Sequence, residues 1–281
     1  MRIGVLHPGA MGSAVARCLR EREHDVLHAG ETRSAATRRR AEAAGMADVG
    51  TLAALFESAD VVLSICPPAN AQEVAREAIA ARFGGLFVDG NAIAPASARA
   101  IEAECAAGGL AFVDGGLVGP PPAAPGSTRF HLSGERAHEV AALFEGSALE
   151  ARVIDGPVGA ASALKMAYAA WTKGGAALLL AIRALARKEG VEDALLAEWD
   201  TSQPGLAARS AGGRITAPKA WRFDGEMDEI ARTFSAAGLP DGFHRAAGDV
   251  YRRLKDFKDA EAIPEIEAVV ARLLDESADP D

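Results

Sequence analysis

The sequence predicts an α/β domain built on a doubly wound parallel sheet, followed by an all-helical C-terminal domain. Two observations support this fold class. In the first half, short apolar runs alternate with segments whose apolar residues recur at helical spacing. After Asp155, helical patterns follow one another and no strand-like run is found. We therefore expect a first domain over residues 1–155 and a helical domain over residues 156–281.

Seven runs in the first half are short and apolar enough to be strands of a sheet that is covered on both faces. They are Ile3–Leu6, Asp25–His28, Val61–Ile65, Leu86–Val88, Ala111–Val113, Phe130–Leu132 and Val153–Ile154. The helical segments between them are Met11–Arg22, Ala35–Ala44, Ala71–Phe83 and Pro95–Ala107. Strands that alternate with helices across short connections are typical of a parallel sheet.

The second half is expected to be helical throughout. One long helical stretch runs from Pro157 to Glu189, and the pair Gly174-Gly175 is its only notable interruption. Further helical segments are Glu192–Asp200, Gly205–Ala211, Pro218–Ala236, Gly242–Leu254 and Pro264–Asp275. The last residues, Glu276–Asp281, are acidic and are expected to fray.

Composition excludes several classes of protein. The chain has 281 residues and a formal net charge of −9, with 49% hydrophobic and 25% charged residues, which is ordinary for a soluble globular protein. The negative charge and an aromatic content of 5% argue against nucleic-acid binding. The apolar stretch Ala176–Ala186 contains Arg183 and cannot span a bilayer, so no membrane partner is expected. Cys18, Cys66 and Cys105 are too widely spaced for a disulfide framework or a metal site, which favours the cytoplasm.

The first predicted strand ends in a glycine-rich turn that opens directly into a helix. The turn is His7-Pro8-Gly9-Ala10-Met11-Gly12. It is a G-x-G-x-x-G dinucleotide fingerprint with His7 in place of the first glycine. Gly9 would let a pyrophosphate approach the backbone, Gly12 would let the helix pack closely on the strand, and N–H groups at the helix start would bind phosphates. The context predicts a Rossmann-like domain; an ordinary glycine-rich turn is the alternative.

The segment after the second predicted strand is expected to select the cofactor. Arginine there would bind the 2′-phosphate of NADP, whereas an acidic residue would bind the ribose hydroxyls of NAD. Arg33 offers a guanidinium and Ser34 a hydroxyl to a phosphate, whereas Glu31 favours NAD. The neighbouring run Arg38–Arg40 is better explained as a solvated helix face. We therefore expect NADP, with NAD as the alternative.

Four further segments follow the fingerprint in an informative order. They are Cys66-Pro67-Pro68, Val88–Asn91, Phe112–Gly119 and Gly156–Lys165. Together with the fingerprint, these segments resemble the β-hydroxyacid dehydrogenase superfamily, which includes 6-phosphogluconate dehydrogenase, 3-hydroxyisobutyrate dehydrogenase and the imine reductases. The second half resembles a branch of phosphogluconate dehydrogenase-like proteins with a C-terminal domain of unknown function, through the segments Ser162–Gly174, Lys219–Met227 and Ala237–His244.

The resemblance implies an NAD(P)-dependent dehydrogenase or reductase that acts on CH–OH or C=N groups of a small molecule. In such a protein Cys66-Pro67-Pro68 would line the nicotinamide, and Asn91 would lie near the cofactor. Lys165 matches the family's catalytic lysine. The helical domain of this family forms dimers, so the resemblance also implies a homodimer.

The substrate loop departs from the family's pattern. Gly116, Val118 and Gly119 are the candidate substrate-binding residues there, and Asp114 is expected to support the loop. The family usually has Ser-Gly-Gly where this chain has Val118-Gly119-Pro120, so a hydroxyl is lost and Pro120 supplies no N–H. The family's asparagine one turn after the lysine is Ala169. These changes argue against 6-phosphogluconate as a substrate.

Helical spacing brings further polar residues to Lys165. At 100° per residue, Tyr168 lies about −60° and Thr172 about −20° from Lys165, so the three share a face. Lys165 could protonate a developing alkoxide and take the proton back in the oxidative direction. Burial and the nearby Lys173 would lower its pKa. Tyr168 is a reserve proton donor and Thr172 could orient substrate, whereas a solvated helix lysine is the alternative.

Two residues of the helical half, Glu226 and His244, are candidates for substrate contacts, with core packing as the alternative. The function that the sequence favours is hydride transfer between NADP and a carbonyl or alcohol carbon. An imine reductase of the same superfamily is an alternative, although the lysine favours a carbonyl because the imine reductases generally place another residue there. A non-catalytic NADP-binding regulatory protein is the alternative from a different class.

Overall fold

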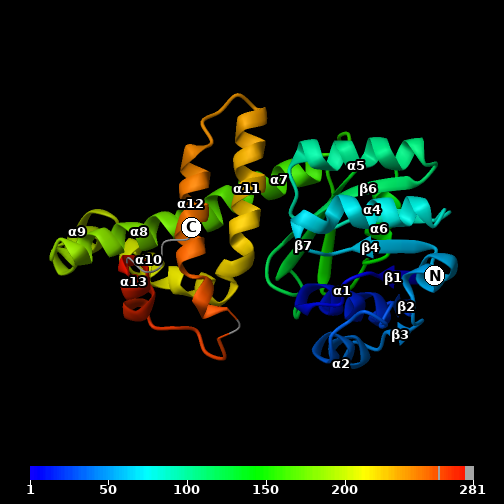
Figure 1. Cartoon of the computed structure of the whole chain (residues 1–281), viewed down its shortest axis with the longest axis horizontal. Helices are drawn as coiled ribbons and strands as arrows, with labels where there is room; N and C mark the ends of the chain where they lie inside the picture. The colour runs from blue at the N-terminus through cyan, green and yellow to red at the C-terminus, as the bar shows by residue number, and fades with distance from the viewer. Residues whose placement is uncertain (259, 276–281) are drawn as a thin grey trace. The chain divides into compact units, whose positions relative to one another are not determined.

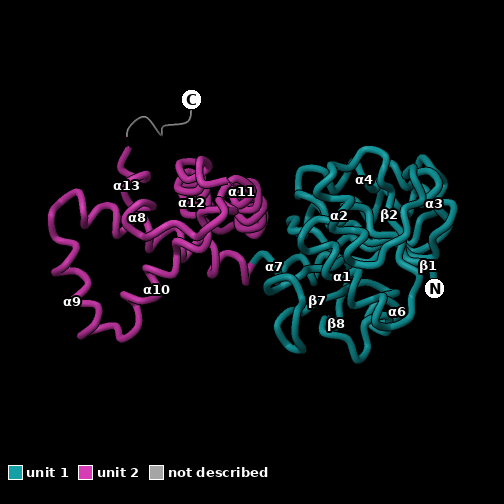
Figure 2. The backbone as a smooth tube through the Cα atoms, turned by 90° about the horizontal axis from the view of Figure 1, so that it is seen from below, with its two compact units in different colours: residues 1–166 teal, residues 167–281 magenta. Residues whose placement is uncertain are grey.

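The computed structural model describes residues 1–258 and 260–275, so the acidic tail predicted to fray at Glu276–Asp281 lies outside the described residues. The chain divides into two compact units, residues 1–166 and 167–281 (Figure 2). The division falls inside one helix, whereas the predicted boundary near Asp155 precedes that helix. In the part of the chain that is described, no helix is long and apolar enough to cross a membrane.

Unit 1 is built on one eight-stranded sheet with the order β3-β2-β1-β4-β5-β6-β7-β8. Its strands are β1 (Arg2–Val5), β2 (Asp25–His28), β3 (Ala47–Asp48), β4 (Val61–Ser64), β5 (Leu86–Asp89), β6 (Ala111–Val118), β7 (Thr128–Ser133) and β8 (Leu149–Val153). Neighbouring strands are parallel except β6 and β7, which form an antiparallel pair. The predicted doubly wound sheet is confirmed, and this one hairpin is its departure from a fully parallel arrangement.

Helices cover both faces of the sheet (Figure 1). They are α1 (Ala10–Glu21), α2 (Ala35–Ala43), α3 (Leu52–Ser58), α4 (Ala71–Ala80), α5 (Pro95–Ala107) and α6 (Ala137–Ala142). One apolar core joins α1 and α6 to the sheet and includes Leu19 and Phe144. The other joins α3, α4 and α5 to the opposite face and includes Leu55 and Ile101. Burial on both faces explains why the strands read as continuous apolar runs.

Three short elements, β3, α3 and α6, were not predicted from the sequence. Strand β3 has two residues, both exposed, so it has no apolar run. Helices α3 and α6 have seven and six residues, which is too short for a helical period to be recognised. A local signal did exist for α3, because the Thr51 hydroxyl accepts a hydrogen bond from the Ala54 N–H and caps the helix.

Every described element of unit 2 is helical. Helix α7 (Ala160–Ala169) enters the unit and is followed by a π-helical turn, Ala170–Gly174. The remaining elements are α8 (Gly175–Lys188), α9 (Glu192–Ser202), α10 (Leu206–Gly212), a 3₁₀ stretch (Gly213–Lys219), α11 (Ala220–Ala236), α12 (Gly242–Arg253), a 3₁₀ turn (Lys255–Phe257) and α13 (Ile266–Leu274). Helices α11 and α12 pack side by side (Figure 1). The predicted helical half is confirmed.

Candidate functional site

The glycine-rich turn between β1 and α1 has the geometry of a phosphate-binding loop. A Cβ atom on Gly12 would overlap the carbonyl oxygen of His7, so only glycine lets α1 start this close to the end of β1. A Cβ atom on Gly9 would meet nothing within 4 Å, so the backbone there is open to a ligand. No side chain caps the first turn of α1, which begins at Ala10 and Met11. The turn therefore presents uncapped N–H groups, as a phosphate site requires.

A pocket of about 420 Å³ lies beside this turn. Its lining residues are His7, Ala29, Glu31, Thr32, Arg33, Gly50, Leu52, Asn70, Glu73, Val74 and Glu77. Two buried polar atoms in it, His7 Nδ1 and Arg33 Nε, have no hydrogen-bond partner in the described part of the chain. Burial and the charge of Arg33 lower the pKa of His7 to about 4, so the imidazole is neutral near pH 7. The pocket thus offers hydrogen-bonding atoms that a polar ligand would satisfy.

The loop that carries Arg33 is supported by Asp48, which the sequence analysis missed. One carboxylate oxygen of Asp48 accepts hydrogen bonds from the N–H groups of Gly30, at 2.9 Å, and Gly50, at 2.8 Å. These bonds hold the pKa of Asp48 below its usual value. The Ser34 hydroxyl accepts a bond from the Thr37 N–H at 3.2 Å and so caps α2. The expectation that Ser34 also contacts a phosphate stays a prediction.

The ends of β4 and β5 are tied together by Asn91. Its side-chain oxygen accepts a hydrogen bond from the Cys66 N–H at 2.5 Å. Its amide nitrogen donates to Ser64 Oγ at 3.2 Å and to Asp89 Oδ2 at 2.8 Å. Both amide hydrogens are therefore donated within the protein. This geometry makes Asn91 a support for the segment Cys66-Pro67-Pro68, and its contact with a cofactor stays a prediction.

Cys66 is not an activated nucleophile in this structure. Burial raises the pKa of its thiol to about 11. A thiol with so high a pKa is protonated near pH 7, and the thiolate is the reactive form. Cys66 and the two prolines after it therefore offer a neutral surface, which suits the predicted contact with a nicotinamide ring.

Lys165 lies on α7 at the carboxyl end of β6. Its Nζ atom donates a hydrogen bond to the Leu117 carbonyl oxygen at 2.5 Å. A Cβ atom on Gly116 would lie 2.9 Å from the Lys165 Cβ atom and 3.0 Å from the Ala161 carbonyl oxygen, so only glycine lets α7 pack this closely on β6. Gly116 therefore positions the lysine.

The other two candidates from the substrate loop are placed differently. Val118 is 2% exposed, so its side chain packs inside the protein. Gly119 has a φ angle of +125°, a region that favours glycine, and a Cβ atom there would overlap the Ser127 carbonyl oxygen. The structure thus gives both residues a role in shaping the loop. Their predicted contacts with substrate stay predictions.

Asp114 anchors the start of α7, a stronger role than the expected support of the loop. The carboxylate is fully buried. One of its oxygens accepts hydrogen bonds from the N–H groups of Gly159, at 2.9 Å, and Ser162, at 3.1 Å, and from the Ser133 hydroxyl at 2.9 Å. The other accepts from the Ser162 hydroxyl at 2.6 Å. A negative charge at a helix N-terminus is stabilising, so Asp114 joins the helix of Lys165 to β6.

The structure changes the helical phase that the sequence predicted for Thr172. Thr172 lies in the π-helical turn, which has more residues per turn than the α-helix assumed for the angles. Its hydroxyl donates to the Tyr168 carbonyl oxygen at 3.2 Å, and the Tyr168 side chain is 44% exposed. Their common face with Lys165 and their predicted catalytic roles stay predictions.

Lys173 also lies in the π-helical turn, and its side chain is paired inside unit 2. The Lys173 ammonium forms an ion pair with Glu226 and lies 4.5 Å from the centre of the Phe223 ring. The Tyr251 hydroxyl donates to the Lys173 carbonyl oxygen at 2.8 Å. Lys173 is thus a paired cation inside unit 2.

Glu226 and His244 are both buried in unit 2. Glu226 is 8% exposed and pairs with Lys173, so the core-packing alternative describes it better than a substrate contact. His244 is 5% exposed and packs on the rings of Phe234 and Phe243. Burial lowers the pKa of His244, and its Nδ1 atom has no partner among the described residues. Its role toward substrate stays a prediction.

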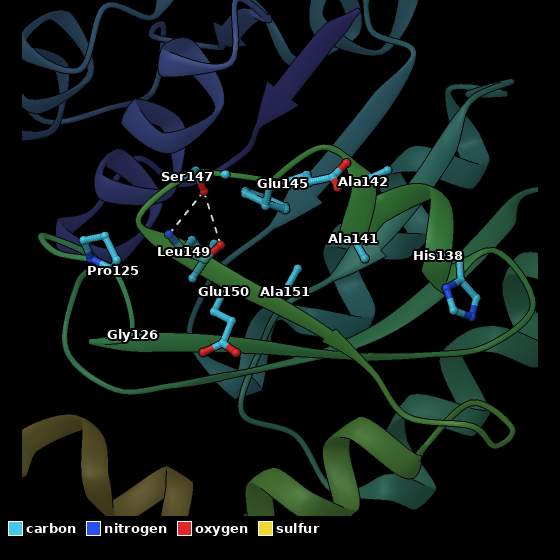
Figure 3. Close-up of a pocket in the computed structure, with 12 residues that line it drawn as sticks. Pro125, Gly126, His138, Ala141, Ala142, Glu145, Ser147, Leu149, Glu150 and Ala151 are labelled. Atoms are coloured by element: carbon cyan, nitrogen blue, oxygen red, sulfur yellow. Dashed lines mark hydrogen bonds between the residues drawn. The ribbon is translucent and has the colours of Figure 1, made fainter.

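Another pocket, of about 530 Å³, lies beside β8 and α6 (Figure 3). None of the predicted site residues lines it. Across the described residues, no group of three or more His, Cys, Asp or Glu side chains could hold a metal ion.

Comparison with protein families identifies the N-terminal unit. Residues 2–150 match the NAD binding domain of 6-phosphogluconate dehydrogenase. The chain belongs to this family. Residues 186–254 match a domain of unknown function, DUF1932. The suspected superfamily and branch are thereby confirmed, and the domain that contains the fingerprint binds a nicotinamide dinucleotide. A search of curated proteins finds no match to this sequence.

Solved structures share the whole architecture. A conserved protein of unknown function, reported as structurally similar to 3-hydroxyacid dehydrogenases, is 26% identical, with a TM-score of 0.68 and coverage of 92% of this chain and 98% of the other. 3-Hydroxyisobutyrate dehydrogenase of Mycobacterium tuberculosis is 20% identical, with a TM-score of 0.71 and coverage of 97% of this chain and 98% of the other. An imine reductase of Myxococcus stipitatus in complex with NADP+ is 20% identical, with a TM-score of 0.57 and coverage of 98% of this chain and 100% of the other. The last two likenesses concern the fold.

Proposed function

We propose that this protein is an NADP-dependent oxidoreductase that transfers a hydride between the nicotinamide and a carbonyl or alcohol carbon of a small metabolite, with Lys165 as general acid and base. The position of Lys165 is the main support. Its ammonium contacts the Leu117 carbonyl near the carboxyl end of β6. Strands β1, β4, β5 and β6 are parallel, so this end lies at the same sheet edge as the fingerprint turn. Ligands of doubly wound sheets bind at that edge.

The residues of the first unit suit a nicotinamide dinucleotide. The open backbone at Gly9 and the uncapped start of α1 suit its pyrophosphate, and the unpaired atoms of His7 and Arg33 suit its polar groups. A bound nicotinamide supplies or accepts the hydride. Arg33 would pair with the 2′-phosphate of NADP, which is the reason for preferring that cofactor. Glu31 lines the same pocket and supports NAD as the alternative.

Lys165 supplies proton chemistry in this proposal. The Leu117 carbonyl accepts one of its three ammonium hydrogens and so fixes the direction of the side chain. In the reductive direction the ammonium protonates the oxygen of the developing alkoxide, and in the oxidative direction the neutral amine accepts that proton. The exposed Tyr168 hydroxyl, three residues later, is the reserve donor.

Two measurements test the proposal. The protein is titrated with NADPH and NADH, and tryptophan quenching reports binding; we expect tighter binding of NADPH. A panel of ketones and aldehydes is then screened for oxidation of NADPH by the protein and by Lys165→Ala. We expect the variant to bind NADPH normally and to lose turnover by about 10²-fold or more. Normal turnover in the variant would exclude Lys165 as the acid.

The altered substrate loop favours a second candidate, a non-catalytic NADP-binding regulatory protein. Val118 is buried and without a hydroxyl, and Pro120 has no N–H, so the loop has lost donors that its relatives use. This candidate predicts NADPH binding that is indifferent to Lys165→Ala, without turnover of any carbonyl. A parallel panel of cyclic imines tests the remaining alternative, since turnover of imines alone would identify an imine reductase.

A homodimer is part of the proposal, and a cytoplasmic location goes with it. On α8, Leu178 and Leu185 are 44% and 61% exposed and lie seven residues apart, with Ile182 between them on the same face. Trp171 and Ile215, which are 64% and 55% exposed, line a largely apolar pocket of about 560 Å³ in the same unit. Exposed apolar side chains gathered in one unit are typical of a protein–protein interface.

A further inference from the structure

The sheet face that α7 contacts continues across β7 and β8. Gly116 on β6 pairs with His131 on β7, and His131 pairs with Arg152 on β8. Paired residues on neighbouring strands point to the same face of a sheet. A Cβ atom on Gly116 would lie 2.9 Å from the Lys165 Cβ atom, so this is also the face on which Lys165 lies. His131 and Arg152 therefore share a face with Lys165.

The next pair along these strands adds another cation. Val118 pairs with Arg129 on β7, and Arg129 pairs with Glu150 on β8. These residues are two positions from the first set, so they point to the same face. Glu150 and Ala151 leave β8 on opposite sides, as this alternation requires (Figure 3). We call the resulting surface the basic face, and its residues are Arg129, His131, Arg152 and Lys165.

Hydrogen bonds orient the cations of the basic face. Arg129 Nη1 donates to the Gly126 carbonyl oxygen at 3.0 Å, and Lys165 donates to the Leu117 carbonyl oxygen. The Gly126 carbonyl oxygen directs the guanidinium of Arg129 without neutralising its charge. The one carboxylate among these strand positions, Glu150, pairs with Arg152 at 2.7 Å. The basic face therefore carries more positive than negative charge, in a protein whose net charge is −9.

The pKa of His131 depends on the charges of the basic face. Its side chain is 9% exposed. Burial lowers its pKa, and the positive charges of Arg152, Arg129 and Lys165 lower it further, whereas Glu150 acts in the opposite direction. The imidazole is thus neutral near pH 7 and lies within electrostatic range of every charged group on this face. An anion bound here would oppose the three cations and raise the pKa of His131.

We propose that the basic face binds an oxyanion group of the substrate, either a carboxylate or a phosphate. The guanidinium of Arg129 offers a planar pair of donors that matches both groups. The substrate loop agrees with this placement, because Val118 is apolar and Pro120 has no N–H, so the donors for an anion come from β7 beside it. The inference rests on the proposed function, since Lys165 would then act on a substrate held by this anion.

Histidine-ring NMR on the intact protein tests the basic face without cofactor or turnover. The pKa of His131, assigned with His131→Gln, is measured in chloride, in malonate and in inorganic phosphate at equal ionic strength. We expect the pKa to rise by about 0.5 or more in malonate or phosphate relative to chloride. Arg129→Gln should abolish the rise. The matched control Arg136→Gln, on the exposed ion pair with Glu139, should retain it.

A pKa of His131 that is the same in all three anions would overturn the inference. A rise that survives Arg129→Gln would also overturn it, because the anion would then bind elsewhere. A larger rise in malonate identifies a carboxylate site, and a larger rise in phosphate identifies a phosphate site. The NMR outcome does not depend on the Lys165→Ala assay, so a failure of the basic face and a failure of the proposed function can be told apart.

Discussion

Among single residues, His7 and Arg33 each offer one buried polar atom to a ligand in the pocket beside the fingerprint turn. His7 Nδ1 and Arg33 Nε have no partner within the described chain. A buried polar atom without a hydrogen bond costs about 1–3 kcal/mol, so a ligand that pairs with these atoms recovers that free energy. The low pKa of His7 keeps the imidazole neutral, whereas arginine stays charged. Arg33 is therefore the residue expected to recognise an additional phosphate.

The substitution Arg33→Gln tests this role. We expect the Kd of NADPH to rise about tenfold or more and the Kd of NADH to change little, because only NADPH carries the 2′-phosphate. Fluorescence titration of each cofactor gives both constants. Arg39→Gln, on the exposed face of α2, is the matched control and should change neither. Equal losses for both cofactors in Arg33→Gln would show that Arg33 contacts a part they share.

Asp89 makes the stability of unit 1 depend on pH. Burial raises its pKa to about 7, and the neighbouring Asp114 adds to this against the hydrogen bonds from Asn91. An aspartate in an unfolded chain titrates near about 3.9. Between these values the folded protein holds a proton that the unfolded chain has released. The free energy of unfolding should therefore fall as the pH rises from about 4 to about 7.

Urea unfolding at pH 5 and pH 8 measures this contribution. The wild type should lose about 2.6 kcal/mol more than Asp89→Asn over this interval, because the variant has no carboxyl group to titrate. The exposed Asp25→Asn is the control and should follow the wild type. If Asp89→Asn shows the same pH dependence as the wild type, the proton on Asp89 is not the cause.

At the scale of elements, the position of Lys165 depends on how α7 is attached to the sheet. Asp114 holds the first turn of α7 through the N–H groups of Gly159 and Ser162 and the hydroxyls of Ser133 and Ser162. Gly116 allows the close approach one turn later. A loss of either contact would displace the helix, and displacement of a catalytic group by a fraction of an ångström lowers turnover.

Asp114→Asn should weaken this attachment while the protein remains folded. Asparagine keeps the shape of the side chain but loses the charge and part of the acceptor capacity. We expect turnover of a carbonyl substrate to fall about tenfold, with the NADPH Kd unchanged, because the fingerprint turn belongs to a different part of the sheet. Circular dichroism checks folding. Unchanged turnover would mean that α7 keeps its place without Asp114.

Sequence patterns predict the helices and strands of unit 1 better than the geometry of the helix that follows Lys165. The alternation of apolar runs and helical segments correctly predicted a parallel sheet covered by helices, since strands buried on both faces are continuously apolar. The angles around Lys165 assumed an α-helix as far as Thr172, whereas Thr172 lies in a π-helical turn with its own tertiary contacts. Gly174 lies against Phe243, and the Tyr251 hydroxyl bonds the Lys173 carbonyl. Neither contact follows from helical spacing.

For the molecule as a whole, the proposed homodimer would bury the exposed apolar face of α8, which carries Leu178 and Leu185. Light scattering should give twice the mass of one chain for the wild type. Leu178→Glu places a charge on that face and should shift the mass toward one chain, because burying an unpaired charge is costly. Leu239→Glu changes an exposed leucine outside α8 and should leave the mass unchanged. A wild-type monomer would contradict the homodimer.

The order of the two halves, the dinucleotide fingerprint and the superfamily could be predicted from the sequence, because these depend on local patterns and on motifs in a fixed order. The match of one segment to the family also made Lys165 the candidate acid and base, which stays a prediction. Which polar atoms find a hydrogen-bond partner could be seen only in the folded chain. The tertiary structure showed that Asn91 and Glu226 pair within the protein, that Asp48 and Asp114 support the site, and that Arg129 shares a face with Lys165. The physical reason is that hydrogen bonds and charge pairs join residues far apart in the chain, and strand register alone decides which side chains meet.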